Sequence, residues 1–177
     1  MTAQEIKAAA ENYIDEAIDD DEAVAAINQA LAKIGDVALV YDTVSITDSV
    51  GRTWLALPDA TTYVVEVLDA DGNVYYGWRV RDNRIWFADA GAYTVHYRRL
   101  PNPISGILDT PEVHPAYHQC LVTYLIGWWK LKDDDESPDG LRNMQQFEAE
   151  VTRVFNTLRR RRGPATITVY RDAASEG

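Results

Sequence analysis

The sequence predicts an α+β fold in which four helices, two at each end of the chain, flank an antiparallel β-meander. An extended tail is expected after the last helix. Apolar residues recur at helical spacing in residues 1–36 and again in 112–162. Between residues 37 and 100 the apolar period falls to two, and turn residues interrupt it at short intervals. We therefore expect a helical domain of 1–36 and 112–162, a β-insertion of 37–100 and a C-terminal tail of 163–177.

Two helices are expected to open the chain. Thr2 and Glu5 have the spacing of a capping box, in which each side chain bonds a free amide of the first turn. The acidic run Asp19–Asp21 is expected to end this helix and to cap the next one. Gly35 follows the last apolar residue of the second helix and suits a left-handed terminal position.

Six strands are expected in the β-insertion, and they form a small sandwich or half-barrel. Asp71-Gly72-Asn73 and Asp82-Asn83 are turn signals, because these residue types accept positive φ. The prolines in Leu100–Pro103 end the sheet. The expected strands are Val37–Thr47, Thr53–Leu57, Tyr63–Leu68, Val74–Val80, Arg84–Ala88 and Ala92–Arg99.

Two further helices are expected after Pro115. The first has one apolar face, and the acidic run that begins at Asp133 breaks it. The second begins near Leu141, ends in an arginine cluster and is terminated by Gly163-Pro164. The simplest packing joins all four helices in one bundle from which the sheet projects. The apolar face of the first of these two helices comprises Tyr117, Cys120, Leu121, Tyr124, Leu125 and Trp128.

Composition bounds the class of protein. The 177 residues carry a net charge of −11, which argues against bulk attraction to nucleic acid or anionic lipid. A single cysteine, Cys120, excludes an intrachain disulfide framework and a cysteine-based zinc cluster. We find no secretory signal and no apolar run near the roughly 18–20 residues of a membrane span. A soluble protein made in a reducing cytoplasm is expected, without membrane association.

The charge is unevenly distributed. Residues 1–36 carry two lysines and nine acidic residues. Residues 153–177 carry six arginines and only two acidic residues. Ends of opposite sign suit copies that pack beside each other, although two solvated helix faces explain the counts equally well.

No catalytic or metal motif stands out, so neither an enzyme nor a cofactor is expected. His114 and His118 are four apart, but Pro115 lies between them, and helix-start packing and capping explain them better than metal binding. The Asp133–Glu136 run lacks the alternation of a calcium loop and is interpreted as a solvated turn. Cys120 lies on an apolar helical stripe and is expected to be a buried thiol.

The arginine cluster and the tail are the sharpest features. Arg159, Arg160, Arg161 and Arg162 suit the negative end of a helix dipole, or they dock on an acidic partner, with nucleic-acid phosphate a less favoured alternative. The tail residues Ile167, Val169 and Tyr170 could form a strand on another chain's sheet edge, a seventh strand of their own meander, or an end without fixed structure.

Aromatic residues offer further candidate surfaces. Trp54, Trp78 and Trp86 could form a carbohydrate platform, or they build a core or an interface. Trp128 and Trp129 are adjacent on a helix and cannot both face the same core, which indicates a contact with another subunit.

The order of these elements resembles the head–tail connector proteins of tailed bacteriophages, also called adaptor or head completion proteins. The likeness covers essentially the whole chain. It rests on the acidic helix pair, the strand Tyr93-Thr94-Val95-His96-Tyr97, the link through Leu100-Pro101, the helix start Pro115-Ala116-Tyr117-His118, and a helix containing Phe147-Glu148-Ala149-Glu150-Val151 that ends in arginines.

The resemblance implies a non-enzymatic virion protein of the neck, assembled in the host cytoplasm. Such proteins form a ring under the portal vertex, usually dodecameric, that extends the DNA channel and docks the next neck or tail-completion protein, with DNA only as passing cargo. It implies portal docking for Arg159–Arg162 and the tail residues Ile167, Val169 and Tyr170. It implies subunit contacts for Tyr117, His118, Trp128 and Trp129. An inter-subunit or channel face would comprise Asp15, Glu16, Asp19, Asp20, Asp21 and Glu22.

The alternative is a binding module. Here the aromatic meander recognises a carbohydrate or a peptide, and the helices serve as its scaffold.

Overall fold

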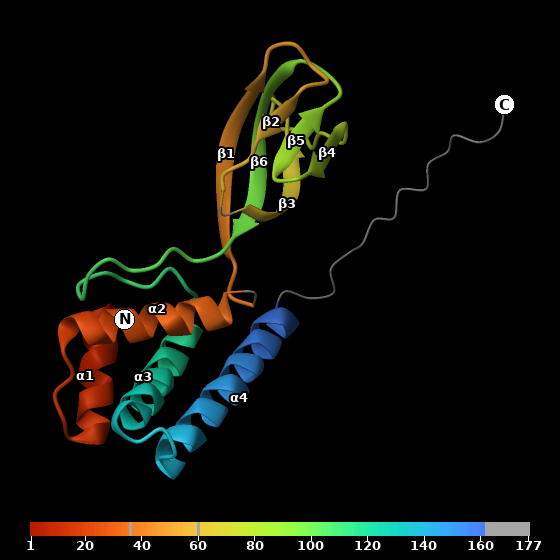
Figure 1. Cartoon of the computed structure of the whole chain (residues 1–177). Helices are drawn as coiled ribbons and strands as arrows, with labels where there is room; N and C mark the ends of the chain where they lie inside the picture. The colour runs from red at the N-terminus through yellow and green to blue at the C-terminus, as the bar shows by residue number, and fades with distance from the viewer. Residues whose placement is uncertain (36, 60, 162–177) are drawn as a thin grey trace.

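The computed structural model describes residues 1–35, 37–59 and 61–161 (Figure 1). This part of the chain is α+β, with a helical domain and two antiparallel sheets. None of its helices has the length and apolar character of a membrane span. The elements are α1 (Ala3–Ile14), α2 (Asp20–Ile34), β1 (Val40–Asp48), β2 (Trp54–Ala56), β3 (Thr61–Leu68), β4 (Trp78–Arg81), β5 (Arg84–Phe87), β6 (Gly91–Arg99), the 3-10 helix η1 (Pro115–Tyr117), α3 (His118–Asp133) and α4 (Pro138–Arg161).

The first two helices begin where their caps predict. The capping box is present, since Thr2 Oγ1 accepts from Glu5 N at 3.2 Å and Glu5 Oε2 accepts from Thr2 N at 3.0 Å. The side chain of Asp19 accepts from Asp21 N and caps α2. However, α1 ends at Ile14, earlier than expected, because Asp15 adopts the left-handed conformation at φ 59° and stops the helix.

The expectation for Gly35 was wrong. Its φ is −50°, an ordinary right-handed value, so the position does not require left-handed backbone. A Cβ built there would lie 2.9 Å from the side chain of Leu100. Glycine is therefore explained by the close approach of the linker that leaves the sheet.

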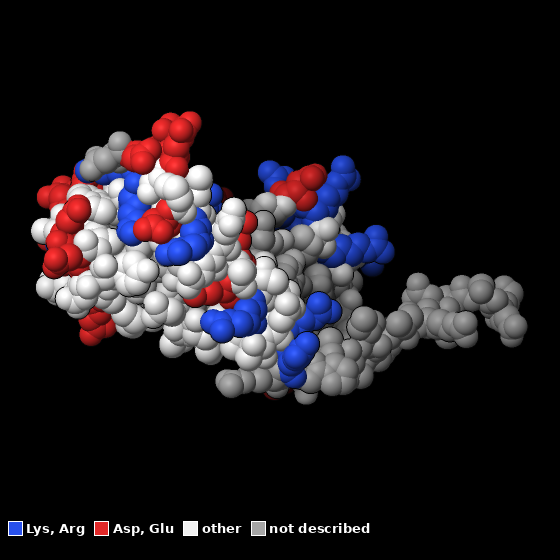
Figure 2. All heavy atoms as spheres, turned by 90° about the horizontal axis from the view of Figure 1, so that it is seen from below, with Lys and Arg blue, Asp and Glu red and all other residues white. Residues whose placement is uncertain are grey.

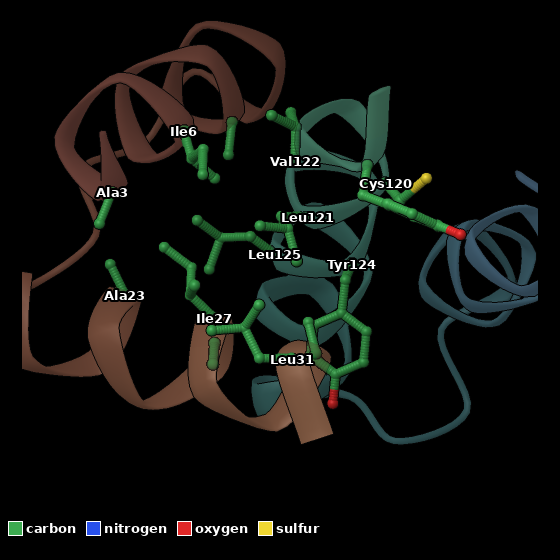
Figure 3. Close-up of a cluster of buried hydrophobic side chains, with 14 of the residues drawn as sticks. Ala3, Ile6, Ala23, Ile27, Leu31, Cys120, Leu121, Val122, Tyr124 and Leu125 are labelled. Atoms are coloured by element: carbon green, nitrogen blue, oxygen red, sulfur yellow. The ribbon is translucent and has the colours of Figure 1, made fainter. Parts of the chain in front are cut away.

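Helix α3 is the centre of the helical domain. It packs against α1 and α2 on one side and against α4 on the other. Figure 3 shows Leu121 and Leu125 pointing toward Ile6 and Ile27, while Cys120 lies on the side of α4. Because both sides are covered, the buried residues of α3 are not confined to one face as expected, and the continuous run 120–127 is buried.

The linker of residues 100–114 follows the helical domain closely. Asn28 of α2 holds it with two hydrogen bonds, from Nδ2 to Ile104 O at 2.9 Å and from Ile104 N to Oδ1 at 2.8 Å. In the first turn of α1, Ala3 N donates a further hydrogen bond to Asp109 O of the linker at 2.8 Å. The linker thus belongs to the helical domain, although it has no regular secondary structure.

The strands form two three-stranded sheets and not a simple meander. The order is β1-β6-β3 in sheet A and β2-β5-β4 in sheet B. The first and last strands pair directly, from Val40↔Arg99 to Asp48↔Gly91. A single meander would expose one whole face of its apolar residues, whereas two sheets bury theirs against each other. The shared core contains Leu57, Val67, Ile85, Phe87, Tyr93 and Val95.

The predicted turns are present, but one strand is shorter than expected. Gly72 has φ 81°, and Asp82 and Asn83 have φ values of 50° and 54° in the turn between β4 and β5. Val74 makes only an isolated bridge to Leu68, and β4 does not begin until Trp78.

Replacing Gly127 by alanine tests the close contact between α3 and α4. A Cβ there would meet Asn143 Cβ at 3.1 Å and the backbone of α4 at 3.3 Å. Helix propensity alone predicts a gain of about 1 kcal/mol. We expect instead that the crowding outweighs this gain and that the free energy of unfolding falls by about 1–2 kcal/mol in chemical denaturation.

The control is Gly106→Ala, because nothing lies within 4 Å of a Cβ at Gly106. This variant should unfold like the parent protein. If Gly127→Ala is more stable than the parent protein, α4 can shift away from α3 without a decrease in the free energy of unfolding.

Candidate interaction surfaces

An arginine-centred ion network joins the β-insertion to the helical domain. Arg99 Nε donates to Asp42 Oδ2 at 2.8 Å, and Nη1 donates to Glu112 Oε2 at 2.9 Å. Glu112 also accepts from Asn102 N at 3.1 Å. Only 12% of the Arg99 side chain is exposed, whereas its two partners are about two-fifths exposed. The guanidinium therefore ties β1 to the end of β6 and to the linker that leads into α3.

The network shifts the ionisation of its members. The hydrogen bond from Arg99 is the main cause that lowers the pKa of Asp42 and of Glu112. The same two bonds raise the pKa of Arg99. All three groups are charged at neutral pH, so the joint is held by ion pairs under ordinary conditions.

A cleft of about 370 Å³ lies at this junction. One wall is the end of α4, and the opposite wall is the start of β1 with neighbouring positions of β3 and β6. Tyr41 contributes a ring that stacks on His96 and lies 5.3 Å from the Arg98 guanidinium. The lining residues are Val37, Ala38, Leu39, Val40, Tyr41, Tyr63, Arg98, Glu112, His114, Tyr117, Phe155, Leu158 and Arg159.

The predicted portal-docking residues are only partly described. Arg159 lines the junction cleft, Arg160 is exposed, and α4 ends at Arg161. Arg162 and the tail residues Ile167, Val169 and Tyr170 lie outside the described residues. Arg159 and Arg160 thus stand in the last turns of α4, where they suit the helix dipole and also face solvent.

The apolar stripe of α4 is unevenly covered along its length. Phe147 is buried against Tyr124, with ring centroids 5.0 Å apart. Val154 and Leu158, nearer the arginines, remain half-buried and line a shallow hollow with Ala116, Arg153 and Thr157. The half of α4 that leads to the arginines therefore offers apolar as well as basic surface.

The acidic residues at the α1–α2 connection are largely engaged within the chain. Trp129 Nε1 donates to Glu16 at 2.9 Å, Lys7 pairs with Asp20, and Lys132 pairs with Glu22 at 2.5 Å. Among the described residues, Asp15 and Asp21 are left without a side-chain partner, and Asp19 serves as a cap. In Figure 2 red side chains gather at the end of the molecule where Figure 1 places α1.

The four predicted interface residues of η1 and α3 pack within the chain. Tyr117 and His118 are buried, and His118 Nδ1 lies 2.8 Å from the Met1 amine. Burial, followed by the neighbouring amine charge, lowers the pKa of His118. Trp128 and Trp129 are both partly buried against the helical core, because α3 has neighbours on two sides and offers both indoles a place.

The other candidate reactive groups have structural roles. His114 Nδ1 accepts from Ala116 N at 3.2 Å and caps η1, which confirms a capping histidine. Burial raises the pKa of Cys120 to about 11, as expected for an inert thiol. Within the described ranges no three His, Cys, Asp or Glu side chains are grouped as metal ligands would be.

Sequence reasoning missed a basic face on the β-insertion. Trp54 and Trp86 were noted as aromatic residues, but the arginines that share their side of sheet B were not. Arg79 and Arg81 alternate along β4, and this period of two was the available signal. Trp78 has a different role, since it packs against the core between the sheets.

Comparison with models of protein families matches residues 1–169 to the family described as SU10 adaptor protein. The match covers the helical domain, the β-insertion and part of the tail. No curated protein matches the chain.

Replacing Arg99 by methionine tests the joint. The variant keeps the length of the side chain but leaves Asp42 and Glu112 without their shared cation. Because these carboxylates are partly solvated, we expect a loss of about 1–2 kcal/mol in the free energy of unfolding, less than for a fully buried pair. Arg142→Met is the control, since Arg142 and Asp139 are both mostly exposed, and it should change stability by less than about 0.5 kcal/mol. Equal effects of the two variants would contradict a special role for Arg99.

The same network predicts an acid-sensitive joint. The folded-state pKa values of Asp42 and Glu112 lie below their ordinary values of 3.8 and 4.5. Their contribution to stability is therefore complete above those values and is lost as pH falls through the folded-state pKa values. In urea titrations between about pH 6 and pH 3, the Arg99→Met variant should lose less stability than the parent protein, and parallel pH profiles would contradict the assignment.

Proposed function

The chain belongs to the SU10 adaptor protein family, and from this membership we propose that it is a head–tail connector that forms a ring beneath the portal. Membership makes it a bacteriophage adaptor, a structural component of the virion. It also confirms the family resemblance seen in the sequence. The ring, its portal contact and its place in the neck are the parts that we propose.

The match across residues 1–169 is the observation that carries the proposal. A structural role also agrees with the chemistry of the described residues. The cysteine is a buried thiol, the histidines cap or pack, and the cleft of about 370 Å³ is a junction between the helical domain and the β-insertion. The surfaces that remain are suited to protein contacts.

We assign portal docking to the end of α4 and the tail that follows it. Arg159 and Arg160 lie in the last turns, next to the half-buried Val154 and Leu158. Arginine beside apolar side chains is a frequent combination at the centre of protein interfaces. An acidic groove on the portal would pair with the arginines while the apolar residues lose their remaining contact with water.

The ring is proposed to form through the helical domain. Trp128 and Trp129 are both partly exposed, Trp129 beside Glu16 of the α1–α2 connection, and they are the candidate contacts between subunits. Asp15 and Asp21, which lack side-chain partners within the described chain, are the acidic positions available to a neighbour or to the channel. A net charge of −11 suits a passage through which DNA slides without adhering.

Mixing the full chain with the portal protein of the same phage tests the proposal directly. Electron microscopy should show a closed ring of this chain on the portal, with a twelve-fold arrangement expected. The chain alone should stay monomeric or associate weakly in analytical ultracentrifugation. A chain that leaves the portal undecorated at high concentration would contradict the connector role.

Two changes locate the portal contact. Deleting residues 163–177 should abolish portal decoration and leave the thermal unfolding of the chain unchanged, because the described core lies outside that segment. The double substitution Arg159→Glu/Arg160→Glu should weaken portal binding by at least about tenfold. Arg142→Glu, an exposed arginine at the other end of α4, is the matched control. Normal docking by the truncated chain would show that the tail assignment is wrong.

A further inference from the structure

The outward face of sheet B carries two rows of arginine and tryptophan. Trp54 and Arg79 are both register partners of Trp86, so these three residues form one row across the sheet. The next row joins Arg81 and Arg84 across the β4–β5 pair. The intervening residues Ile85 and Phe87 are buried against sheet A, which places both rows on the opposite, outward side.

These side chains have few partners within the described chain. The Arg79 guanidinium lies 5.5 Å from the Trp86 ring. Arg81 pairs only with its neighbour Asp82 at 3.2 Å, and both side chains are about four-fifths exposed. Arg84 forms no ion pair with any residue that the structure describes. The face therefore presents guanidinium groups that are still open to a partner.

A hollow of about 410 Å³ lies beside these rows, and its lining includes Trp54, Arg81, Asp82 and Arg84. Trp54 forms an apolar wall, and 42% of its surface is exposed. Two arginines in one hollow favour a carboxylate, since guanidinium and carboxylate form paired hydrogen bonds. The hollow can thus hold an acidic side chain with an indole packed against it.

We propose that the outward face of sheet B docks an acidic surface of another protein of the virion. The inference rests on the proposed function only in taking that partner to be a neck or tail component. Charge complementarity supports it, because three arginines face outward here on a chain of net charge −11. Tryptophan and arginine are also the residue types that most often dominate the energy of protein interfaces.

Nucleic acid fits this face less well. Three arginines neutralise at most about three phosphates, and that contact is weak at physiological salt. Asp82 adds a carboxylate to the hollow, and the net charge of the chain repels a polyanion of high charge density. A second copy of the chain is a weaker acidic partner, because Glu16, Asp20 and Glu22 of its acidic end are already paired and, among its described residues there, only Asp15 and Asp21 keep unpaired side chains.

Binding of a deca-glutamate peptide to the full chain tests the chemistry of this face. We expect calorimetric binding at about 50 mM salt that weakens at about 200 mM. Arg81→Glu/Arg84→Glu should weaken it by at least about tenfold, and Arg81→Gln/Arg84→Gln should give a smaller loss in the same direction. Lys33→Glu/Arg142→Glu changes the net charge equally at exposed helical positions and should retain binding. Trp54→Ala should weaken binding of the peptide severalfold. Attraction to the overall charge of the chain would not explain that loss, because the substitution leaves the charge unchanged.

Three results would overturn the proposal. If Arg81→Glu/Arg84→Glu and Lys33→Glu/Arg142→Glu lose the same affinity for the peptide, the peptide is attracted only by overall charge. Tighter binding of an about 20-bp DNA duplex than of the peptide, lost in Arg81→Glu/Arg84→Glu, would identify a nucleic-acid face. If the parent chain does not bind the peptide, the proposal that this face docks an acidic partner is wrong.

The assembled neck separates this inference from the connector role. Arg81→Glu/Arg84→Glu should still decorate the portal, because α4 is unchanged, but it should fail to recruit the protein that follows in the neck. If that protein binds the variant normally, the docking face is wrong while the connector role stands. If the parent chain ignores the portal, the connector role fails, and the peptide experiment still decides the chemistry of the face.

Discussion

The two-sided burial of α3 is the constraint on which the rest of the structure depends. A helix covered on both sides must be apolar almost all round, and residues 120–127 meet that demand with Gly127 at the contact with α4. Because α3 takes up the apolar sides of α1, α2 and α4 at once, those helices can keep polar outward faces. The result differs from a symmetric bundle. Helix α4 packs mainly along α3. The C-terminal half of α4 is only partly covered by other elements, which leaves surface for a partner.

The β-insertion depends in turn on the ends of its own chain segment. Its first and last strands, β1 and β6, pair along their whole length within sheet A, so the chain enters and leaves the insertion through neighbouring strands. Arg99 stands at the foot of this strand pair and joins it to the linker through Asp42 and Glu112. These paired strands and the ion network at their base join the insertion to the helical domain, from which the sheets project (Figure 1). In this position sheet B is open to a partner different from the one that we propose for α4.

Local signals in the sequence predicted local structure well. The caps at Thr2 and Asp19 and the turn at Asp82-Asn83 are confirmed, because each depends on residues only a few positions apart. The strand order was not predictable in this way, since the pairing of β1 with β6 joins residues about fifty positions apart and leaves no period in the sequence. Gly35 was misread for the same reason. Its requirement comes from Leu100, a residue distant in the chain.

The candidate surfaces show the same division, and charge illustrates it best. Counting charges along the chain suggested an acidic front and a basic end, and it treated each carboxylate as available. In the structure Glu16, Asp20 and Glu22 already bond Trp129, Lys7 and Lys132, so half of the six acidic residues at the α1–α2 connection have side-chain partners within the chain. The basic residues behave in the opposite way, since register places separate arginines of β4 and β5 on one open face. What a charged residue offers to a partner is therefore decided by the contacts that it has already made, and Arg79, Arg81 and Arg84 have made fewer within the described chain than Glu16, Asp20 and Glu22 suggest for the acidic end.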